Sequence, residues 1–481
     1  MSERNLTLLT DLYELTMMQG YFHAKDANET VIFDAFYRTN PDGNGFAITA
    51  GLEQVVEYIE NLHFDKEDID YLRTTGLFGE DFLEYLADFK FTGDIYAIPE
   101  GTVVFPREPL VKVIAPIMQA QLVETAILNI INHQSLIATK TSRIVHAARG
   151  DGVMEFGLRR AQGPDAGIYG ARAAMIGTSN VLCGQMFDVP VKGTHAHSWI
   201  MSFPDELTAF RTYAKLYPTA CILLVDTYDT LNSGIPHAIQ VFKEMRAEGI
   251  PLTFYGIRMD SGDLAYLSKE AKKMLDAEGF TDAVISASND LDETLITSLK
   301  NQGATINSWG VGTNLITSKD CPSFGGVYKL AAIMDKKTGK FIPKIKLSEN
   351  EEKITNPGNK TTYRIYGKDS HKVIADIICL VGETFNEDEP LLLFDPIATW
   401  KKTLLAPGTY TMRELPVQVF KDGECVYHSP KVMDIQKYCK EELNTLWDET
   451  KRLVNPHEVH VDLSKPLWDM KHALLDKYHF E

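Results

Sequence analysis

The chain has 481 residues, of which 66 are acidic and 48 are basic, so its formal net charge is -18. Apolar residues make up 44% and charged residues 24%, a balance typical of an ordinary folded protein and not of a disordered or fibrous one. The negative charge gives no general attraction for nucleic acid or for an anionic membrane, and no apolar run approaches the ~20 residues that span a bilayer. We therefore expect neither nucleic acid nor membrane as a partner.

The amino terminus and the cysteines indicate a compartment. Residues 1–5 lack the basic and then apolar order of a secretory signal. The six cysteines, at positions 183, 221, 321, 379, 425 and 439, are scattered without a C-x-x-C pair. This spacing argues against a zinc site or a disulfide framework. We expect a reduced, cytoplasmic protein.

The opening third predicts an α+β domain over residues 1–117. Thr10 is a plausible helix cap before apolar residues at helical spacing. A β-prone run and a Pro- and Gly-containing turn region come next, then an amphipathic helical stretch and short strands. The corresponding ranges are 11–23 for the first helix, 30–38 for the β run, 40–45 for the turn, 52–90 for the helical stretch and 92–115 for the strands.

Residues 118–335 predict a catalytic domain with parallel strands. A long helical stretch over 118–149 is followed by short β-prone runs that alternate with helical patterns, which is typical of a parallel sheet. The eight runs are 153–157, 174–178, 189–194, 221–226, 252–258, 283–288, 305–311 and 326–332. Their spacing favours an irregular, TIM-like (β/α) barrel, and an open doubly wound sheet is the alternative.

The end of the chain returns to β texture and then to helix. Residues 336–430 predict a β-rich segment that packs with the N-terminal domain, and residues 431–481 predict a helical region. Five basic residues lie in a polar stretch after a predicted hairpin turn at 335–340. A solvated basic loop is the favoured interpretation, and a lid over an anionic substrate is the other. These residues are Lys344, Lys346, Lys353, Lys360 and Arg364.

Polar and charged side chains follow the predicted strands at the point where each strand ends. In parallel barrels the active site is built from these carboxyl ends, so the clusters indicate one pocket. Arg159 and Arg258 suit a carboxylate or phosphate through bidentate contacts, although ion pairs with nearby aspartates are the competing explanation. The loops at 260–263 and 310–313 offer backbone N–H groups to a phosphate.

The stretch Gly193-Thr194-His195-Ala196-His197-Ser198-Trp199 lies between a β-prone run and a helical pattern. Two histidines two residues apart on an extended segment point the same way, so both could face the pocket. Histidines there indicate either chemistry or a metal site, and two histidines hydrogen-bonded in a loop are the simpler alternative.

Five motifs, in the same order along the chain, resemble those of the nicotinate phosphoribosyltransferase family over nearly the whole length. They are Thr10-Asp11-Leu12-Tyr13-Glu14-Leu15-Thr16-Met17, Glu155-Phe156-Gly157-Leu158-Arg159-Arg160-Ala161-Gln162-Gly163-Pro164-Asp165, Gly193-Thr194-His195-Ala196-His197-Ser198, Arg258-Met259-Asp260-Ser261-Gly262-Asp263, and Gly310-Val311-Gly312-Thr313 with Gly325-Gly326-Val327-Tyr328-Lys329-Leu330.

The resemblance implies an enzyme that joins nicotinate to 5-phosphoribosyl 1-pyrophosphate, with Mg²⁺ held through substrate phosphates and with ATP hydrolysis coupled through a phosphohistidine, in NAD salvage. It also implies an irregular barrel packed on a domain built from both ends of the chain, and a homodimer. His197 matches the phosphorylated histidine, and His195 occupies a variable position of that motif.

The substrate residues follow from the same resemblance and from the chemistry. Tyr13, Arg159, Thr194 and Arg258 match the nicotinate pocket, with Tyr13 supplied across a subunit interface, and Thr313 matches a phosphoribosyl contact. Asp260 is expected to face the positive charge that develops on the ribosyl carbon. The backbone cradles add four further phosphoribosyl or phosphate contacts, which are Ser261, Gly262, Asp263 and Gly312.

Ser179 bears on the choice between nicotinate and nicotinamide. A carboxylate after Gly177-Thr178 would accept an N–H from a carboxamide, and this chain has Ser179 there. Without that carboxylate a negatively charged acid is not repelled. We therefore expect a strong preference for nicotinate.

Two other functions fit parts of the sequence. A metal-dependent hydrolase could use His195 and His197 as zinc ligands, but it needs further ligands on later strands, and those clusters contain no histidine. A catalytically silent binding protein on the same fold is the second alternative. The presence of His197 and Arg258 argues against the second.

Overall fold

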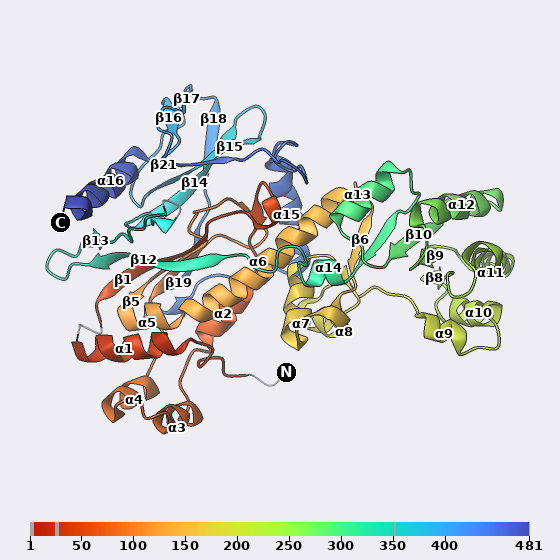
Figure 1. Cartoon of the computed structure of the whole chain (residues 1–481), viewed down its shortest axis with the longest axis horizontal. Helices are drawn as coiled ribbons and strands as arrows, with labels where there is room; N and C mark the ends of the chain where they lie inside the picture. Colours follow the sequence, from red (N-terminus) through yellow and green to blue (C-terminus); the bar gives the residue numbers. More distant parts are fainter. Residues whose placement is uncertain (1–3, 25–27, 351–352, 481) are drawn as a thin grey trace. The chain divides into compact units, whose positions relative to one another are not determined.

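The computed structural model describes residues 4–24, 28–350 and 353–480. Contacts divide the chain into two compact units: residues 1–136, 323–430 and 434–481 form the first, and residues 137–322 with 431–433 form the second. The second unit is therefore inserted into the sequence of the first. Helix α6 (Glu124–Ala147) carries the chain from one unit into the other (Figure 1).

The first unit is built around a seven-stranded sheet in which every pairing is antiparallel. β1 (Thr30–Tyr37) is central and almost wholly buried, which explains its run of β-branched and aromatic residues. The sheet order is β13 (Phe341–Pro343), β12 (Gly326–Met334), β1, β5 (Val111–Pro116), β3 (Asp94–Ala97), β19 (Val417–Lys421) and β20 (Glu424–Cys425), and β2 (Ala47–Ile48) pairs separately with β4 (Val103–Val104).

The prediction that residues 326–332 form the eighth parallel strand is wrong. β12 pairs antiparallel with β1, where Val31 lies opposite Ile333 and Tyr37 opposite Gly326. The Tyr328 ring stacks on Phe33 at 4.7 Å, and its hydroxyl donates to the Ala120 carbonyl oxygen. The β-prone sequence of residues 326–332 predicts a strand but not the sheet that the strand joins. Packing against β1 places this strand in the antiparallel sheet.

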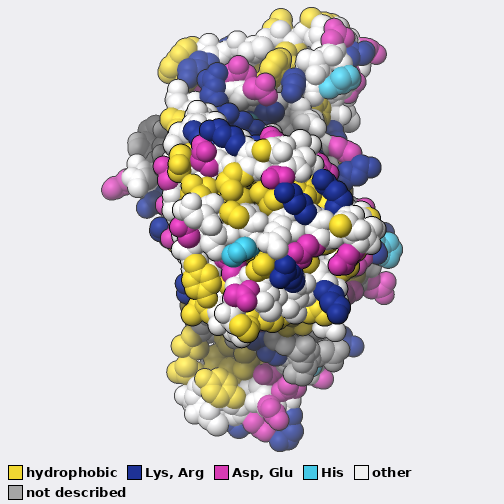
Figure 2. Space-filling view, turned by 90° about the vertical axis from the view of Figure 1, so that its right-hand side faces the viewer, with side chains coloured by type: hydrophobic (Ala, Val, Ile, Leu, Met, Phe, Trp, Pro, Cys, Tyr) yellow, Lys and Arg dark blue, Asp and Glu magenta, His cyan; other side chains and the backbone are white. Residues whose placement is uncertain are grey.

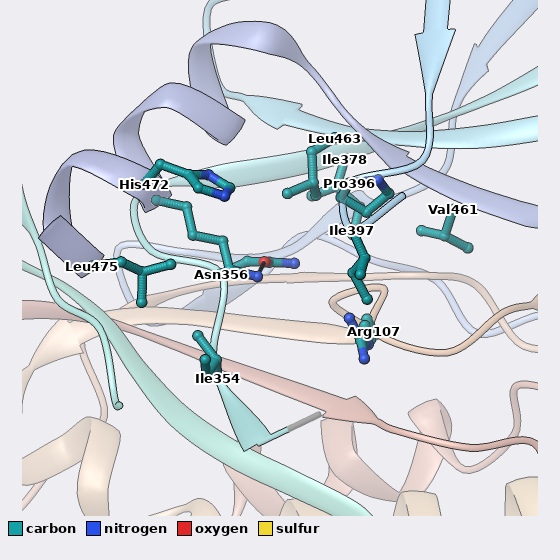
Figure 3. A pocket seen from close by; sticks show the side chains of 11 residues that line it. Arg107, Ile354, Asn356, Ile378, Pro396, Ile397, Val461, Leu463, His472 and Leu475 are labelled. Atoms are coloured by element: carbon teal, nitrogen blue, oxygen red, sulfur yellow. Dashed lines mark hydrogen bonds between the residues drawn. The ribbon is translucent and has the colours of Figure 1, made fainter. Parts of the chain in front are cut away.

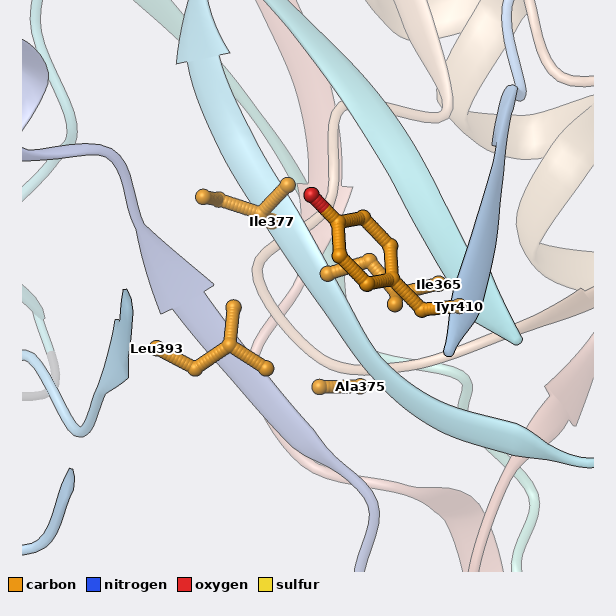
Figure 4. Packing of buried hydrophobic residues seen from close by; sticks show 5 residues of the cluster. All are labelled: Ile365, Ala375, Ile377, Leu393 and Tyr410. Carbon is orange, nitrogen blue, oxygen red and sulfur yellow. The ribbon is translucent and has the colours of Figure 1, made fainter. Parts of the chain in front are cut away.

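A second sheet of the first unit has the order β18 (Tyr410–Glu414), β14 (Lys360–Gly367), β15 (Val373–Leu380) and β21 (His460–Leu463). On this sheet Ile365, Ala375, Ile377 and Tyr410 form a buried cluster with Leu393 of the hairpin β16 (Leu391–Phe394) and β17 (Lys402–Leu405), as Figure 4 shows. Ala375 and Ile377 are two residues apart on β15, so the period of two directs both side chains to the same face.

Two of the five basic residues assigned to a solvated loop are buried in β14. Lys360 pairs with Asp34 at 2.7 Å, and Arg364 pairs with Asp376 at 2.6 Å and with Glu442 at 3.2 Å. The solvated-loop interpretation is therefore wrong for Lys360 and Arg364. Each sits next to a carboxylate because a buried charge without a partner is very unfavourable.

Helices cover the sheets of the first unit. The hydrophobic spacing over 52–90 forms three helices, and the predicted helix at 11–23 is present. The helices are α1 (Leu12–Ala24), α2 (Leu52–Glu60), α3 (Lys66–Thr74), α4 (Glu80–Ala87), α5 (Ile117–Leu122), α15 (Val432–Thr445), whose first two residues are grouped with the second unit, and α16 (Lys465–Phe480).

The second unit contains a six-stranded, fully parallel sheet, as the alternating pattern predicts. Its order is β7 (Gly177–Thr178), β6 (Gly152–Glu155), β11 (Ser308–Val311), β10 (Val284–Ser288), β9 (Tyr255–Met259) and β8 (Cys221–Leu224). The predicted strand at 189–194 is reduced to one parallel bridge between Thr178 and Val191. With β12 in the other unit, six of the eight predicted strands form this sheet.

Helices form the crossovers between these strands, and four of them begin at an Asp or Asn cap. Asp205, Asp263 and Asp292 each accept a backbone N–H three residues later, which satisfies a donor that the helix leaves free. The helices are α7 (Pro164–Ala173), α8 (Val181–Phe187), α9 (His197–Met201), α10 (Glu206–Leu216), α11 (Ile235–Ala247), α12 (Leu264–Ala277), α13 (Glu293–Asn301) and α14 (Thr313–Ile316).

The described part of the chain includes no helix that is both long and apolar enough to cross a membrane. On the face drawn in Figure 2, basic and acidic side chains are interspersed with apolar ones. The surface shown there therefore offers charges of both signs.

Candidate active site

The carboxyl ends of three neighbouring strands, β8, β9 and β10, are joined by hydrogen bonds. Asp226 follows β8, and its Oδ2 accepts the backbone N–H of Asp260 at 2.8 Å and the hydroxyl of Ser261 at 2.7 Å. Ser288 ends β10 and donates to Asp260 Oδ1 at 2.5 Å. Parallel neighbours present their ends at one edge, so residues far apart in sequence meet there.

His197 lies against this carboxylate group. It is the first residue of α9, and its Nδ1 is 3.0 Å from the Thr227 hydroxyl. Its Nε2 is 3.9 Å from Asp226 Oδ1 and 4.0 Å from Asp260 Oδ2. The imidazole is 39% exposed, so a ligand can reach it while two acids and a hydroxyl orient it.

Arg258, near the end of β9, holds the preceding loop. Its guanidinium donates to the Thr194 hydroxyl at 2.9 Å and to the His195 carbonyl oxygen at 3.0 Å. Burial lowers the pKa of Arg258, and the nearby Asp260 and Asp226 oppose that shift. Arg258 and Thr194 are thus in direct contact.

His195 does not point the same way as His197. Its ring is buried with an edge toward Tyr213 at 4.6 Å, and its Nε2 lies 3.4 Å from the backbone N–H of Leu224. Burial, with the charge of Arg258 as the second cause, lowers the pKa of His195 to about 4. The segment turns into α9 between the two histidines, so the period of two does not hold.

Within residues 4–24, 28–350 and 353–480, no three or more His, Cys, Asp or Glu side chains are arranged so that they alone could hold a metal ion. His195, one of the two ligands that the hydrolase alternative needs, packs among aromatic rings instead. This packing removes the sequence argument for a two-histidine zinc site.

Phe156, directly after β6, packs closely against Gly310 of β11. A Cβ at Gly310 would lie 2.5 Å from the Phe156 ring, so only glycine lets the ring approach this closely. Gly312 caps α14, and Thr313 is its first residue. Arg159 is exposed in the helical turn after β6, and its charge is near enough to lower the pKa of Arg258.

The loop after β9 has a mixed role. Gly262 adopts φ +83°, a conformation that favours glycine, and Ser261 is tied to Asp226. The Asp263 carboxylate accepts the backbone N–H of Tyr266 at 3.0 Å as the cap of α12. Asp263 therefore has a structural partner besides its predicted phosphate role.

Tyr13 belongs to the first unit. It lies on α1 with 46% of its surface exposed. Burial of part of the side chain and the adjacent Glu124 carboxylate raise its pKa. The phenol is therefore neutral at physiological pH.

Several residues at these strand ends were not assigned a site role from the sequence. They are Phe156, Asp226, Thr227 and Ser288, and the signal available for three of them was position directly after a predicted strand or at its end. Asp226 is the most informative because its side chain is only 1% exposed.

Comparison with known proteins decides the family. Three models match in order: the nicotinate phosphoribosyltransferase N-terminal domain at residues 8–132, the nicotinate phosphoribosyltransferase family at 152–361, and the C-terminal domain at 359–471. A nicotinate phosphoribosyltransferase of Bacillus subtilis is 47% identical over 97% of this chain and 94% of its own. The chain belongs to the nicotinate phosphoribosyltransferase family.

Other members of the nicotinate phosphoribosyltransferase family agree. The nicotinate phosphoribosyltransferase of Homo sapiens is 30% identical over 97% of this chain and 96% of its own. A crystal structure of the human nicotinic acid phosphoribosyltransferase superposes with a TM-score of 0.81, at 28% identity, covering 97% of this chain and all of the other. The strand-end residues described above all lie within the match at 152–361.

Proposed function

We propose that this chain transfers the phosphoribosyl group of 5-phosphoribosyl 1-pyrophosphate to nicotinate, giving nicotinate mononucleotide and pyrophosphate. The pyridine nitrogen forms the new bond to C1 of the ribose, and the C1–O bond breaks with its electron pair leaving on pyrophosphate. Membership of the family and the grouping of His197, Arg258 and Asp260 at neighbouring strand ends support the proposal.

The contact between Arg258 and Thr194 supports the proposal that nicotinate is the substrate. Arg258 is largely buried and already binds a hydroxyl and a carbonyl oxygen, so its guanidinium is held in one orientation. A carboxylate that approaches it gains a charge-assisted hydrogen bond, worth about 1.5–3 kcal/mol. The exposed Arg159 adds a second cation, and the half-buried Phe156 ring is proposed to pack against the pyridine.

Asp260 suits the sugar. The C1–O bond breaks through a centre with oxocarbenium character, which a nearby carboxylate stabilises. Asp260 is 41% exposed, whereas Asp226 is buried, so Asp260 is the acid that a substrate can meet. The loop residues Ser261, Gly262 and Asp263, with Gly312 and Thr313, are proposed to hold the phosphoribosyl group through backbone N–H donors.

His197 is proposed to accept a phosphoryl group from ATP and to lose it again to water, so that ATP hydrolysis is coupled to the transfer. When an imidazole nitrogen bonds to the transferred phosphoryl group, positive charge develops on the ring. Asp226 and Asp260 lie within 4.0 Å of Nε2 and stabilise that charge.

The same carboxylates fit Mg²⁺ that arrives with substrate phosphates. Asp226 Oδ1 is buried without a hydrogen bond among the described residues, and Asp260 Oδ2 faces the same histidine. Carboxylate oxygens are the ligands that Mg²⁺ prefers. When bound, the ion would neutralise charge on the pyrophosphate leaving group.

We further propose a homodimer in which the exposed Tyr13 contributes its ring to the nicotinate pocket of the partner, and a cytoplasmic role in supplying a precursor of NAD. All six cysteines are free thiols, which fits a reducing compartment.

The deciding experiment measures nicotinate mononucleotide formed by the purified protein from nicotinate and 5-phosphoribosyl 1-pyrophosphate, with and without ATP. We expect product in both cases and more with ATP. The absence of product both with and without ATP contradicts the proposed transfer, and a rate that ATP leaves unchanged contradicts only the coupling.

A further inference from the structure

The first unit contains a small cavity that shares no residue with the candidate active site. Its volume is ≈ 60 Å³, and Figure 3 shows residues from the β4–β5 loop, the segment before β14, β21 and α16 around it. Its walls are aliphatic side chains such as Ile378, Ile397, Leu463 and Leu475. An apolar cavity of about 150 Å³ can hold a six-carbon ring, so this cavity has room for a much smaller ligand.

Donors for an anion border the same space. The side chains of Arg107, Asn356 and Lys471 line it. Lys471 Nζ donates to Asn356 Oδ1 at 3.0 Å, which leaves the amide nitrogen of Asn356 as a donor. Among the described residues that line the cavity there is no carboxylate, although the chain as a whole carries 66 acidic against 48 basic residues.

Arg107 is held in place by its backbone. Its φ is +75°, an uncommon conformation for a residue with a side chain, and its N–H donates to the Tyr37 carbonyl oxygen at 2.7 Å. Such conformations persist where surrounding structure enforces them, and they concentrate at ligand-binding positions. Among the described residues the Arg107 guanidinium forms no ion pair, so its charge is available to a ligand.

The opposite wall is also rigid. Trp468 Nε1 donates to the Pro396 carbonyl oxygen at 3.0 Å, which joins α16 to the loop after β16. The His472 ring stacks on Trp468 at 3.6 Å, and its Nδ1 donates to the Trp468 carbonyl oxygen at 2.8 Å. Two sides of the cavity are thus fixed before any ligand binds, which lowers the entropic cost of binding.

We propose that this cavity binds a small aliphatic monocarboxylate of two to four carbons. The guanidinium of Arg107 offers two parallel N–H donors to the carboxylate, and the amide of Asn356 offers a third. The alkyl chain lies against the isoleucine and leucine walls. A fully hydrated oxyanion such as phosphate has no apolar part to place there and is the poorer fit.

The test titrates the full-length protein with acetate, propionate and butyrate at constant ionic strength, followed by saturation-transfer NMR. We expect affinity to rise about three- to fourfold with each added methylene, as apolar burial predicts. We expect phosphate and chloride not to displace butyrate. Equal affinity for the three acids, displacement by phosphate, or no binding at all would overturn the proposal.

Variants locate the binding. Arg107→Gln is expected to weaken butyrate binding at least tenfold, and Lys477→Gln, which removes the same charge at an exposed position of α16, is expected to leave it unchanged. Leu475→Trp fills the cavity while keeping every donor, and it is expected to abolish binding if Arg107→Gln proves unstable. Arg258→Lys distinguishes the cavity from the candidate active site. If Arg258→Lys loses butyrate binding and Arg107→Gln retains it, butyrate binds at the candidate active site and the proposal is refuted.

Discussion

His197 and Asp226 face each other across 3.9 Å, from Nε2 to an Oδ1 that is buried and has no hydrogen bond among the described residues. The other oxygen of Asp226 binds the backbone N–H of Asp260 and the hydroxyl of Ser261. One buried carboxylate therefore orients the histidine, the second acid and the adjacent loop.

Asp226→Asn should weaken the effect of ATP. The amide oxygen can still accept both hydrogen bonds that the loop donates to Oδ2, but the amide carries no charge to stabilise a phosphorylated ring. We expect ATP-stimulated product formation to fall about ten- to a hundredfold, corresponding to about 1.5–3 kcal/mol. Steady-state rates with and without ATP measure this, and Asp276→Asn, which pairs with Lys272 on α12, is the control.

His197→Ala should abolish stimulation by ATP while some ATP-independent product formation remains, because the residue is proposed to accept phosphate and not to contact the ribose. Incorporation of radiolabelled phosphate from ATP should also disappear. His457→Ala, at an exposed position, serves as the comparison. An ATP dependence that survives in His197→Ala would remove the phosphohistidine.

Arg258→Lys should raise the KM for nicotinate about ten- to a hundredfold with a smaller effect on the KM for the activated ribose. Lysine keeps the charge, but a single ammonium cannot hold Thr194 and the His195 carbonyl oxygen and also meet a carboxylate. The control is Arg246→Lys, whose guanidinium lies over the Phe280 ring at 4.1 Å. Equal effects on both substrates would contradict a role in nicotinate binding.

Ser179→Asp should shift the preference toward nicotinamide. Ser179 follows β7, and its N–H donates to the Glu155 carbonyl oxygen, which fixes the position of a side chain there. An added carboxylate repels an acid and accepts the N–H of an amide. We expect the ratio of kcat/KM for nicotinate to that for nicotinamide to fall at least tenfold, whereas Ser179→Asn should change it much less.

Asp462 should make the stability of the first unit depend on pH. Burial, with the charge of Asp395 as the second cause, raises the pKa of Asp462 to about 7 in the folded protein. The folded chain then keeps a proton that the unfolded chain releases near pH 4, so this group favours folding below about pH 4 and the benefit is lost as pH rises through 7.

Asp462→Asn is neutral at every pH and removes this dependence. Between pH 5 and pH 7 the free energy of unfolding of the variant should rise relative to that of the wild type, by at most about 1.4 kcal/mol per pH unit. The melting midpoint of the variant should rise relative to that of the wild type over the same range. Differential scanning calorimetry at several pH values measures it, with the exposed Asp369→Asn as control. Parallel profiles for Asp462→Asn and the wild type would contradict the raised pKa.

The alternating pattern predicted the parallel sheet because consecutive strands of that sheet are joined by local crossovers. β12 was misassigned because its partner β1 lies almost 300 residues earlier in the chain. The local sequence of residues 326–332 does not indicate a pairing with so distant a strand. Lys360 and Arg364 were assigned to solvent for a related reason: the carboxylates that neutralise them lie on other elements.

The candidate site was partly predictable. Arg258 and Asp260 follow a strand and belong to a family motif, and a parallel sheet brings such ends together. The burial of His195 depends on the aromatic residues of α10, and the role of Asp226 depends on hydrogen bonds to the loop after the next strand. Those partners are visible only in three dimensions.

The pairing of β1 with β12 has a consequence for biosynthesis. At 5–20 residues per second, a ribosome needs roughly 15–60 s to make the chain that separates the two strands. Throughout that time one long edge of the nascent sheet has no neighbour, while the inserted second unit can already condense. Molecular chaperones that shield exposed strand edges should therefore matter most during the first minute of this protein's existence.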